Sequence, residues 1–265
     1  MKDKPKLILV GDEWTQGSYI DATTSSDLAV ENSFRKFFSV TNLGSLESSP
    51  KKSLQLLEQY LKHIELKGNY PRSNITVVVV LGNMFRDMNI PQTGILDAHR
   101  QSVLSFLSEV GVLTKQLLPN STHAENEHRL GWFVVGGSTD IGSKVIESVT
   151  QLHDDHYVPD VIPSWCGLVD ETYMSIPFSH DPDRLLLNSS IDPSEVNVIE
   201  LMMAKRLEYD RLVAKGLLSA DYVPTEMMTD VLAEYVHGVA INRFSNVSYV
   251  GQRELHDAES KKHFT

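Results

Sequence analysis

The segment from residue 7 to residue 17 constrains the fold more than any other part of the chain. The apolar run Leu7–Val10 is typical of a buried strand, and the Gly11-Asp12 turn that follows leads toward a helix. In α/β proteins this layout presents functional side chains at the carboxyl end of the first strand. The segment therefore predicts a parallel α/β sheet with a site beside its first turn.

The rest of the chain continues this alternation of strands and helices. Apolar residues recur at helical spacing, both between Leu54 and Ile64 and between Val103 and Leu113. Strands are expected at Lys6–Val10, Phe38–Asn42, Thr76–Leu81, Trp132–Gly136 and Val161–Trp165. This pattern predicts a three-layer α/β domain with a five-stranded, mainly parallel sheet covered on both faces. The loops after the strands would then surround one crevice.

Two helical stretches are expected after the sheet, at about 194–214 and 224–242. We expect residues 1–214 to form the α/β domain and residues 215–265 to form a helical C-terminal extension. The extension carries more apolar side chains than a single packed stripe needs, which favours contact with a partner or a second copy. The alternative is that it covers an open face of its own sheet.

Composition excludes several classes of function. The 265 residues carry a net charge of −11 without a basic cluster, which argues against nucleic acid as a partner. No apolar run approaches the roughly 20 residues of a membrane span, so no membrane partner is expected. No signal peptide is expected before Leu7, and Cys166 is the only cysteine, so we expect a cytoplasmic protein without an internal disulfide.

The first turn resembles the first block of the SGNH (GDSL-type) hydrolases. That block reads Gly-Asp-Ser-x-Thr-x-Gly, and residues 11–17 match every fixed position except the nucleophile, where Glu13 stands. The resemblance spans roughly residues 6–214 in its order of elements. It implies an SGNH-like fold. The aromatic residue directly after the Gly-Asp-x turn, here Trp14, resembles the first block of SGNH-type proteins encoded by bacteriophages, some of which are virion components.

The next two blocks of the family are altered in this chain. Its second block is Asn-x-Gly-x-x-Gly, and Asn42–Gly44 matches it until Glu47 replaces the last glycine. The third block is Gly-x-Asn-Asp, and here Gly82 is followed by Met84–Phe85 at the Asn-Asp positions. The resemblance therefore implies that two donors to the oxyanion, the glycine of the second block and the asparagine of the third, are missing.

The last block, Asp-x-x-His-Pro, has Ser189 at the aspartate and Asp192 at the histidine. The family mechanism needs a serine nucleophile, a histidine base and an orienting aspartate, and these residues supply none of them. We therefore interpret the chain as catalytically degenerate, acting in binding or assembly with a protein partner or a second copy. The alternative is a hydrolase, esterase or glycan-acting, that uses relocated groups or carboxylate- and metal-based chemistry.

Candidate site residues follow from these blocks. Glu13, Glu47 and Asp192 are the candidate catalytic carboxylates, which would either bind a hard cation or raise one another's pKa, or else remain solvated loop residues. The crevice would also be lined by Asp12, Thr15, Gly44, Gly82, Asn83 and Ser138.

A transition-metal site is a weaker hypothesis. His153 and His156 stand at helical spacing with carboxylates between them, but two histidines at a helix end are also typical of a favourable contact with the helix dipole. No cofactor is expected.

Overall fold

The computed structural model describes residues 4–16, 29–66, 75–87, 94–117, 130–142, 145–146, 160–170, 173 and 198–244. Five strands in these ranges form one sheet in the order β2-β1-β3-β4-β5, and every neighbouring pair is parallel. The strands are β1 (Lys6–Val10), β2 (Ser39–Asn42), β3 (Ile75–Leu81), β4 (Leu130–Gly136) and β5 (Asp160–Ile162). The predicted three-layer α/β architecture with a five-stranded parallel sheet is confirmed.

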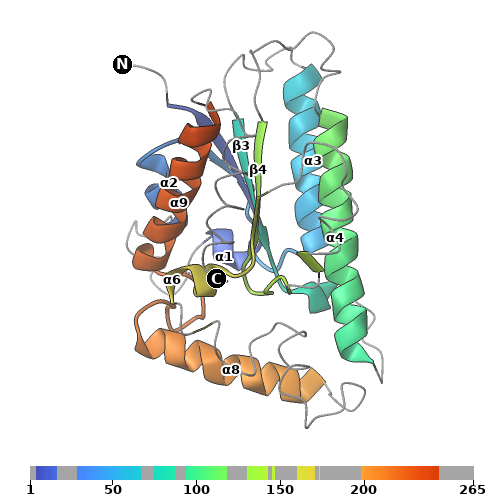
Figure 1. Ribbon diagram of the computed structural model, residues 1–265, viewed down its shortest axis with the longest axis vertical. Helices are drawn as coiled ribbons and strands as arrows, with labels where there is room; N and C mark the ends of the chain where they lie inside the picture. The colour runs from blue at the N-terminus through green and yellow to red at the C-terminus, as the bar shows by residue number, and fades with distance from the viewer. Residues whose placement is uncertain are drawn as a thin grey trace, which may run out of the picture.

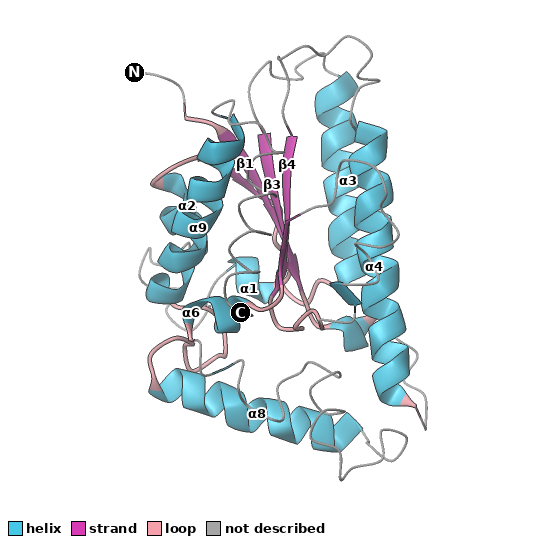
Figure 2. Cartoon of the chain, viewed as in Figure 1, coloured by secondary structure: helices cyan, strands magenta, loops and turns pink. Residues whose placement is uncertain are grey.

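Helices cover both faces of this sheet (Figures 1 and 2). Helices α2 and α9 lie on one face, and α3 and α4 lie side by side on the other. Short elements follow the ends of β1, β3 and β5. The described helices are α1 (Glu13–Gln16), α2 (Ala29–Arg35), α3 (Pro50–Leu66), the 3₁₀ helix η1 (Met84–Arg86), α4 (Ile95–Leu117), α6 (Trp165–Val169), α8 (Val198–Ala214) and α9 (Glu226–Phe244).

The sheet divides the hydrophobic core into two layers. Along β1, Leu7 and Leu9 pack with the α2 and α9 side, whereas Ile8 and Val10 pack with the α3 and α4 side. This is the two-residue period of a strand whose faces are both covered. All seven residues of β3 are buried for the same reason, which places the central strand between both layers.

The fifth strand is shorter than predicted. It ends at Ile162, and Trp165 begins α6 instead of continuing the strand. Ser164 is the N-cap, with an extended backbone and a hydroxyl that accepts a hydrogen bond from the Gly167 N–H at 3.1 Å. Trp165 is nevertheless fully buried, and its indole N–H donates to the carbonyl of Met228 at 3.0 Å. Its apolar character therefore reflects burial in a helix and not in a strand.

Helix α9 packs against α2 and the sheet. Met228, Leu232, Ala233 and Val236 of α9 are all completely buried in the same core layer as β1. At the rim of this contact, Lys36 donates to both oxygens of Asp230, at 2.6 and 2.7 Å. Helix α9 thus forms half of one covering layer, while the proposed division of the chain at residue 214 stays a prediction.

Helix α8 lies across the carboxyl ends of the strands, at the bottom of Figure 1. Its Tyr209 reaches the loop after β4, where the phenol donates to the Ser138 carbonyl at 3.4 Å. The Tyr209 ring also contacts the ring of Trp14, with centroids 5.8 Å apart. Helix α8 therefore closes the end of the sheet where the candidate site is expected. In the ranges given above, no helix combines the length and the apolar character that a membrane span requires.

Candidate active site

Asp12 joins three loops at the carboxyl end of the sheet. It follows β1, which lies between β2 and β3, so the loops after these strands meet beside it. One carboxylate oxygen accepts from the Trp14 N–H at 3.0 Å. The other accepts from the Asn83 N–H at 3.3 Å and from the Ser138 hydroxyl at 3.2 Å. The carboxylate is completely buried, and its contacts fix the loops after β1, β3 and β4 relative to one another.

This environment raises the pKa of Asp12 to about 6. Burial is the largest cause, because it disfavours the charged carboxylate, and the neighbouring negative charge of Glu13 acts in the same direction. The backbone N–H donors and the Arg86 guanidinium lower the pKa but do not offset burial. Asp12 therefore changes charge in mildly acidic solution.

Glu13, at the position of the family nucleophile, forms a two-point ion pair with Arg86. The Arg86 nitrogens lie 2.7 and 2.8 Å from the two Glu13 oxygens. Both side chains are 26% exposed, so solvent reaches the pair. Arg86 also donates to the Ser48 carbonyl at 3.1 Å and approaches an Asp12 oxygen at 3.7 Å.

The Glu13 carboxylate is stabilised in its charged form. Burial raises its pKa. The hydrogen bonds and charge of Arg86, together with the backbone N–H groups of Glu13 and Glu47, lower the pKa by more than burial raises it. The result is a pKa below the usual value for glutamate. Both oxygens already accept hydrogen bonds, so this carboxylate is a weak base and a weak nucleophile.

Glu47 has an unusual backbone at this point. Its φ is 52°, in the left-handed region that glycine adopts most readily. This is the position at which the resemblance puts a glycine. The Glu47 backbone N–H lowers the pKa of Glu13, so these two residues lie near each other.

The remaining crevice residues fill the space between the loops. The Thr15 hydroxyl donates to the Asp12 carbonyl at 2.8 Å, and the Asn42 amide donates to the Thr15 carbonyl at 2.9 Å. A Cβ at Gly44 would lie 2.2 Å from the Thr15 hydroxyl oxygen, and one at Gly82 would lie 2.5 Å from an Asp12 carboxylate oxygen. These glycines therefore permit close packing of the loops.

A second polar group lies under α8 and was not predicted. Tyr173 donates to the Asp140 carboxylate at 2.7 Å, and both side chains are buried. Burial raises the pKa values of Tyr173 and Tyr209 well above the usual value for tyrosine, with the charge of Asp140 as a further cause. Glu208 of α8 is buried nearby and raises both values as well. Asp140 lies two residues after Ser138, in the loop after β4, whereas the tyrosines carry no local signal in the sequence.

Sequence reasoning also missed Arg86, the only residue whose side chain bonds directly to Glu13 in the contacts given above. Asp192, His153 and His156 lie outside the described residues. Among the residues with described positions, no cluster of three or more His, Cys, Asp or Glu side chains is arranged to hold a metal ion. Glu13 and Glu47 instead share Arg86 as a nearby positive charge.

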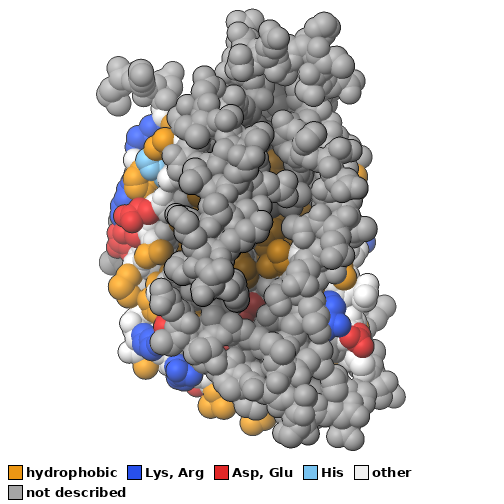
Figure 3. All heavy atoms as spheres, viewed as in Figure 1, with side chains coloured by type: hydrophobic (Ala, Val, Ile, Leu, Met, Phe, Trp, Pro, Cys, Tyr) orange, Lys and Arg blue, Asp and Glu red, His pale blue; other side chains and the backbone are white. Residues whose placement is uncertain are grey.

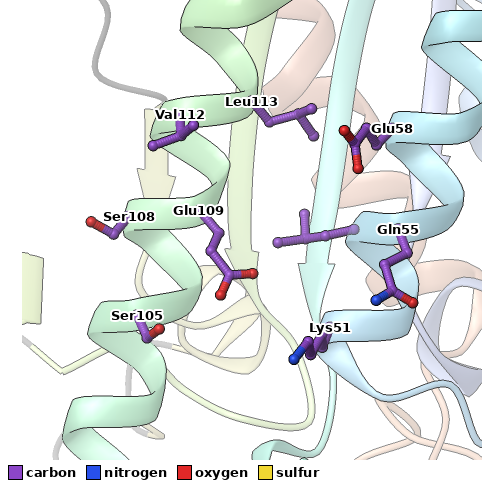
Figure 4. A pocket seen from close by; sticks show the side chains of 9 residues that line it. Lys51, Gln55, Glu58, Ser105, Ser108, Glu109, Val112 and Leu113 are labelled. Atoms are coloured by element: carbon purple, nitrogen blue, oxygen red, sulfur yellow. The ribbon is translucent and has the colours of Figure 1, made fainter.

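A separate cavity lies on the outer surface between α3 and α4 (Figure 4). Its volume is about 460 Å³, and its polar lining includes Lys51, Glu58 and Glu109 above an apolar floor of Leu54 and Leu113. None of the predicted crevice residues lines it.

Comparisons with known proteins add little to this geometry. No family model matches the chain, and no curated protein matches its sequence. Among solved structures, a lipase/acylhydrolase from Enterococcus faecalis is 15% identical, with a TM-score of 0.40 over 89% of this chain and 96% of the other. Protein YXIM from Bacillus subtilis is 12% identical, with a TM-score of 0.41 over 94% of this chain and 58% of the other. With TM-scores this low, neither likeness bears on activity.

Proposed function

We propose that this chain is an SGNH-hydrolase-like protein that has lost acyl-transfer chemistry and acts by binding or assembly. The Glu13–Arg86 ion pair carries this proposal. At the nucleophile position it puts an acceptor-only carboxylate whose two oxygens are held by a guanidinium. A serine hydroxyl activated by a base would need that space and a different neighbour.

Exposed apolar side chains on the C-terminal helices support a protein partner or a second copy. On α8, Met203 is 63% and Leu207 is 67% exposed, one helical turn apart. On α9, Met227 is 52% exposed. Figure 3 shows orange apolar side chains along the lower edge, over α8, and on the side where α9 lies. Methionine is enriched at interface cores, and a virion component would need such a surface.

The loss of chemistry is tested with short-chain p-nitrophenyl esters and a serine-directed organophosphonate. We expect no turnover above a buffer blank and no labelling of any serine. Glu13→Ser should also remain inactive, because the members of a catalytic triad act as a unit and this change returns one of them. Labelling of Ser138, or turnover by the parent protein, would refute the proposal.

Binding is tested by sedimentation velocity over a range of protein concentrations. Met203→Ser combined with Leu207→Ser should reduce self-association or complex formation. The matched control is Val112→Ser on α4, which removes an apolar side chain that is 55% exposed on a helix away from α8. A parent protein that stays monomeric and forms no complex would contradict this role.

One observation favours a carboxylate-based hydrolase as the second candidate. Asp12 has a raised pKa and its neighbour Glu13 a lowered one, and such divergence is typical of acid and base partners. Against it, Asp12 is completely buried and already accepts three hydrogen bonds. Hydrolysis of a glycan or ester that disappears in Asp12→Asn while the fold is retained would favour this candidate.

A further inference from the structure

The surroundings of Glu13 form a receptor for a carboxylate. Two Arg86 nitrogens each donate to a different oxygen of the Glu13 carboxylate. The fork of a guanidinium matches a planar carboxylate in this two-point geometry. The backbone N–H of Glu47 also stabilises the charged form of this carboxylate and lowers its pKa. A charged fork and a backbone donor therefore converge on one position.

Glu13 occupies this position only with its side-chain carboxylate. Glu13 is 26% exposed, as is Arg86, so the carboxylate can swing toward solvent without disturbing the buried core. Arg86 has an independent anchor, because it also donates to the Ser48 carbonyl at 3.1 Å. The receptor would consequently keep its shape when the Glu13 carboxylate leaves.

The other nearby carboxylates are not placed to fill the vacated position. Asp12 lies 3.7 Å from an Arg86 nitrogen, but its oxygens are already bound by Trp14, Asn83 and Ser138. Turning toward Arg86 would break those contacts in a buried place, which is costly. The Glu47 charge acts on Arg86, but none of the described hydrogen bonds or ion pairs joins the Glu47 carboxylate to Arg86.

We propose that Arg86 and the Glu47 N–H form a carboxylate-binding site that Glu13 occupies from within the same chain, and that a carboxylate-bearing ligand binds there by displacing Glu13. The side chain of Glu13 acts as a tethered competitor. A free carboxylate binds only the fraction of molecules in which the site is open, so its apparent affinity falls by that fraction. Carboxylate binding and ester hydrolysis are separate properties, so each assay can fail without the other.

The test is an NMR titration of ¹⁵N-labelled Glu13→Ala with sodium acetate, at constant ionic strength and above the pKa of Asp12. We expect saturable shifts at the Glu47 amide and the Arg86 guanidinium. The apparent affinity should exceed that of the parent protein by about tenfold or more, because the tethered competitor is gone. Sodium chloride alone and inorganic phosphate are parallel titrations that distinguish a carboxylate site from a general anion site.

Two kinds of control make the result decisive. Glu58→Ala removes a carboxylate from another ion pair, which Glu58 makes with Lys62 on α3 at 2.6 Å, and it should leave acetate binding at the parent level. In the Glu13→Ala background, Arg86→Lys should weaken binding and Arg86→Met should abolish it, with thermal melts verifying that each variant is folded. Absence of saturable shifts in Glu13→Ala would overturn the proposal. Equal binding after Arg86→Met, or equal shifts with chloride, would do so as well.

Discussion

Two adjacent methionines on α9 provide a sharp test of how this helix is packed. Met228 is completely buried against the core layer that includes Trp165, whereas Met227 is 52% exposed. The two side chains have the same volume and belong to the same helical turn. Substituting each with alanine therefore separates the cost of losing core packing from the small effect of alanine on helix propensity.

Met228→Ala should lower the free energy of unfolding by about 2–5 kcal/mol, the usual range for a buried methionine truncated to alanine. A domain of this size typically has about 5–15 kcal/mol in total, so the loss is large. The melting temperature should fall by roughly 4–15 °C, from about 2–4 °C per kcal/mol. Met227→Ala should stay within about 0.5 kcal/mol of the parent.

Urea unfolding followed by tryptophan fluorescence is suited to this comparison. The Trp165 indole N–H donates to the Met228 carbonyl at 3.0 Å, so one of the three tryptophans that contribute to the emission lies at the contact between α6 and α9. Circular dichroism provides a second probe, and coincident transitions justify a two-state analysis. Equal losses in the two variants, or a loss below about 1 kcal/mol for Met228→Ala, would refute the packing of α9 described above.

Three further outcomes follow from the structure. Arg86→Met should lower the free energy of unfolding by about 2 kcal/mol, a value between those for exposed and buried ion pairs, because Glu13 is left half-buried without a counter-charge. A double-mutant cycle with Glu13→Gln measures the coupling energy of the pair, and additive losses in the two single variants would contradict this prediction. The pKa of Asp12 is raised from 3.8 to about 6, so between these pH values the folded chain holds a proton that the unfolded chain has released. The contribution of Asp12 to the free energy of unfolding therefore falls as the pH rises from about 4 to about 6. Asp12→Asn should remove this pH dependence in urea unfolding experiments, and an unchanged pH dependence would count against the raised pKa. A chain ending at Ala214 should aggregate or fail to fold, as judged by solubility and circular dichroism, and a soluble, cooperatively melting product would show that α9 is dispensable.

The regular parts of the fold are predictable because their signals are local. The apolar runs of β1 and β3 are long enough to identify buried strands, and the spacing in α3 and α4 identifies the helices that cover them. The error at the fifth strand has a local cause as well. Trp165 was assigned to a strand by its apolar character, but the preceding Ser164 caps a helix.

The site is only partly predictable, because its contacts join distant parts of the chain. The family resemblance predicts that Glu13 and Glu47 share one crevice, and in the structure the charges of both act on Arg86. The pairing of Arg86 with Glu13 spans 73 residues and leaves no periodic signal in either segment. The burial of Tyr209 likewise depends on how α8 crosses the strand ends, which its own sequence does not determine.

The Glu13–Arg86 ion pair connects segments that lie far apart in the sequence. A half-buried carboxylate at position 13 is destabilising unless a cation accompanies it, and Arg86, at the end of η1 after β3, supplies that cation. The Glu47 backbone N–H, from the loop after β2, lowers the pKa of the same carboxylate. The segments after β1, β2 and β3 therefore meet at one carboxylate. A serine at position 13 would leave Arg86 without its partner beside Asp12, so we expect Glu13→Ser to change the charge balance of the whole site and not only the residue replaced.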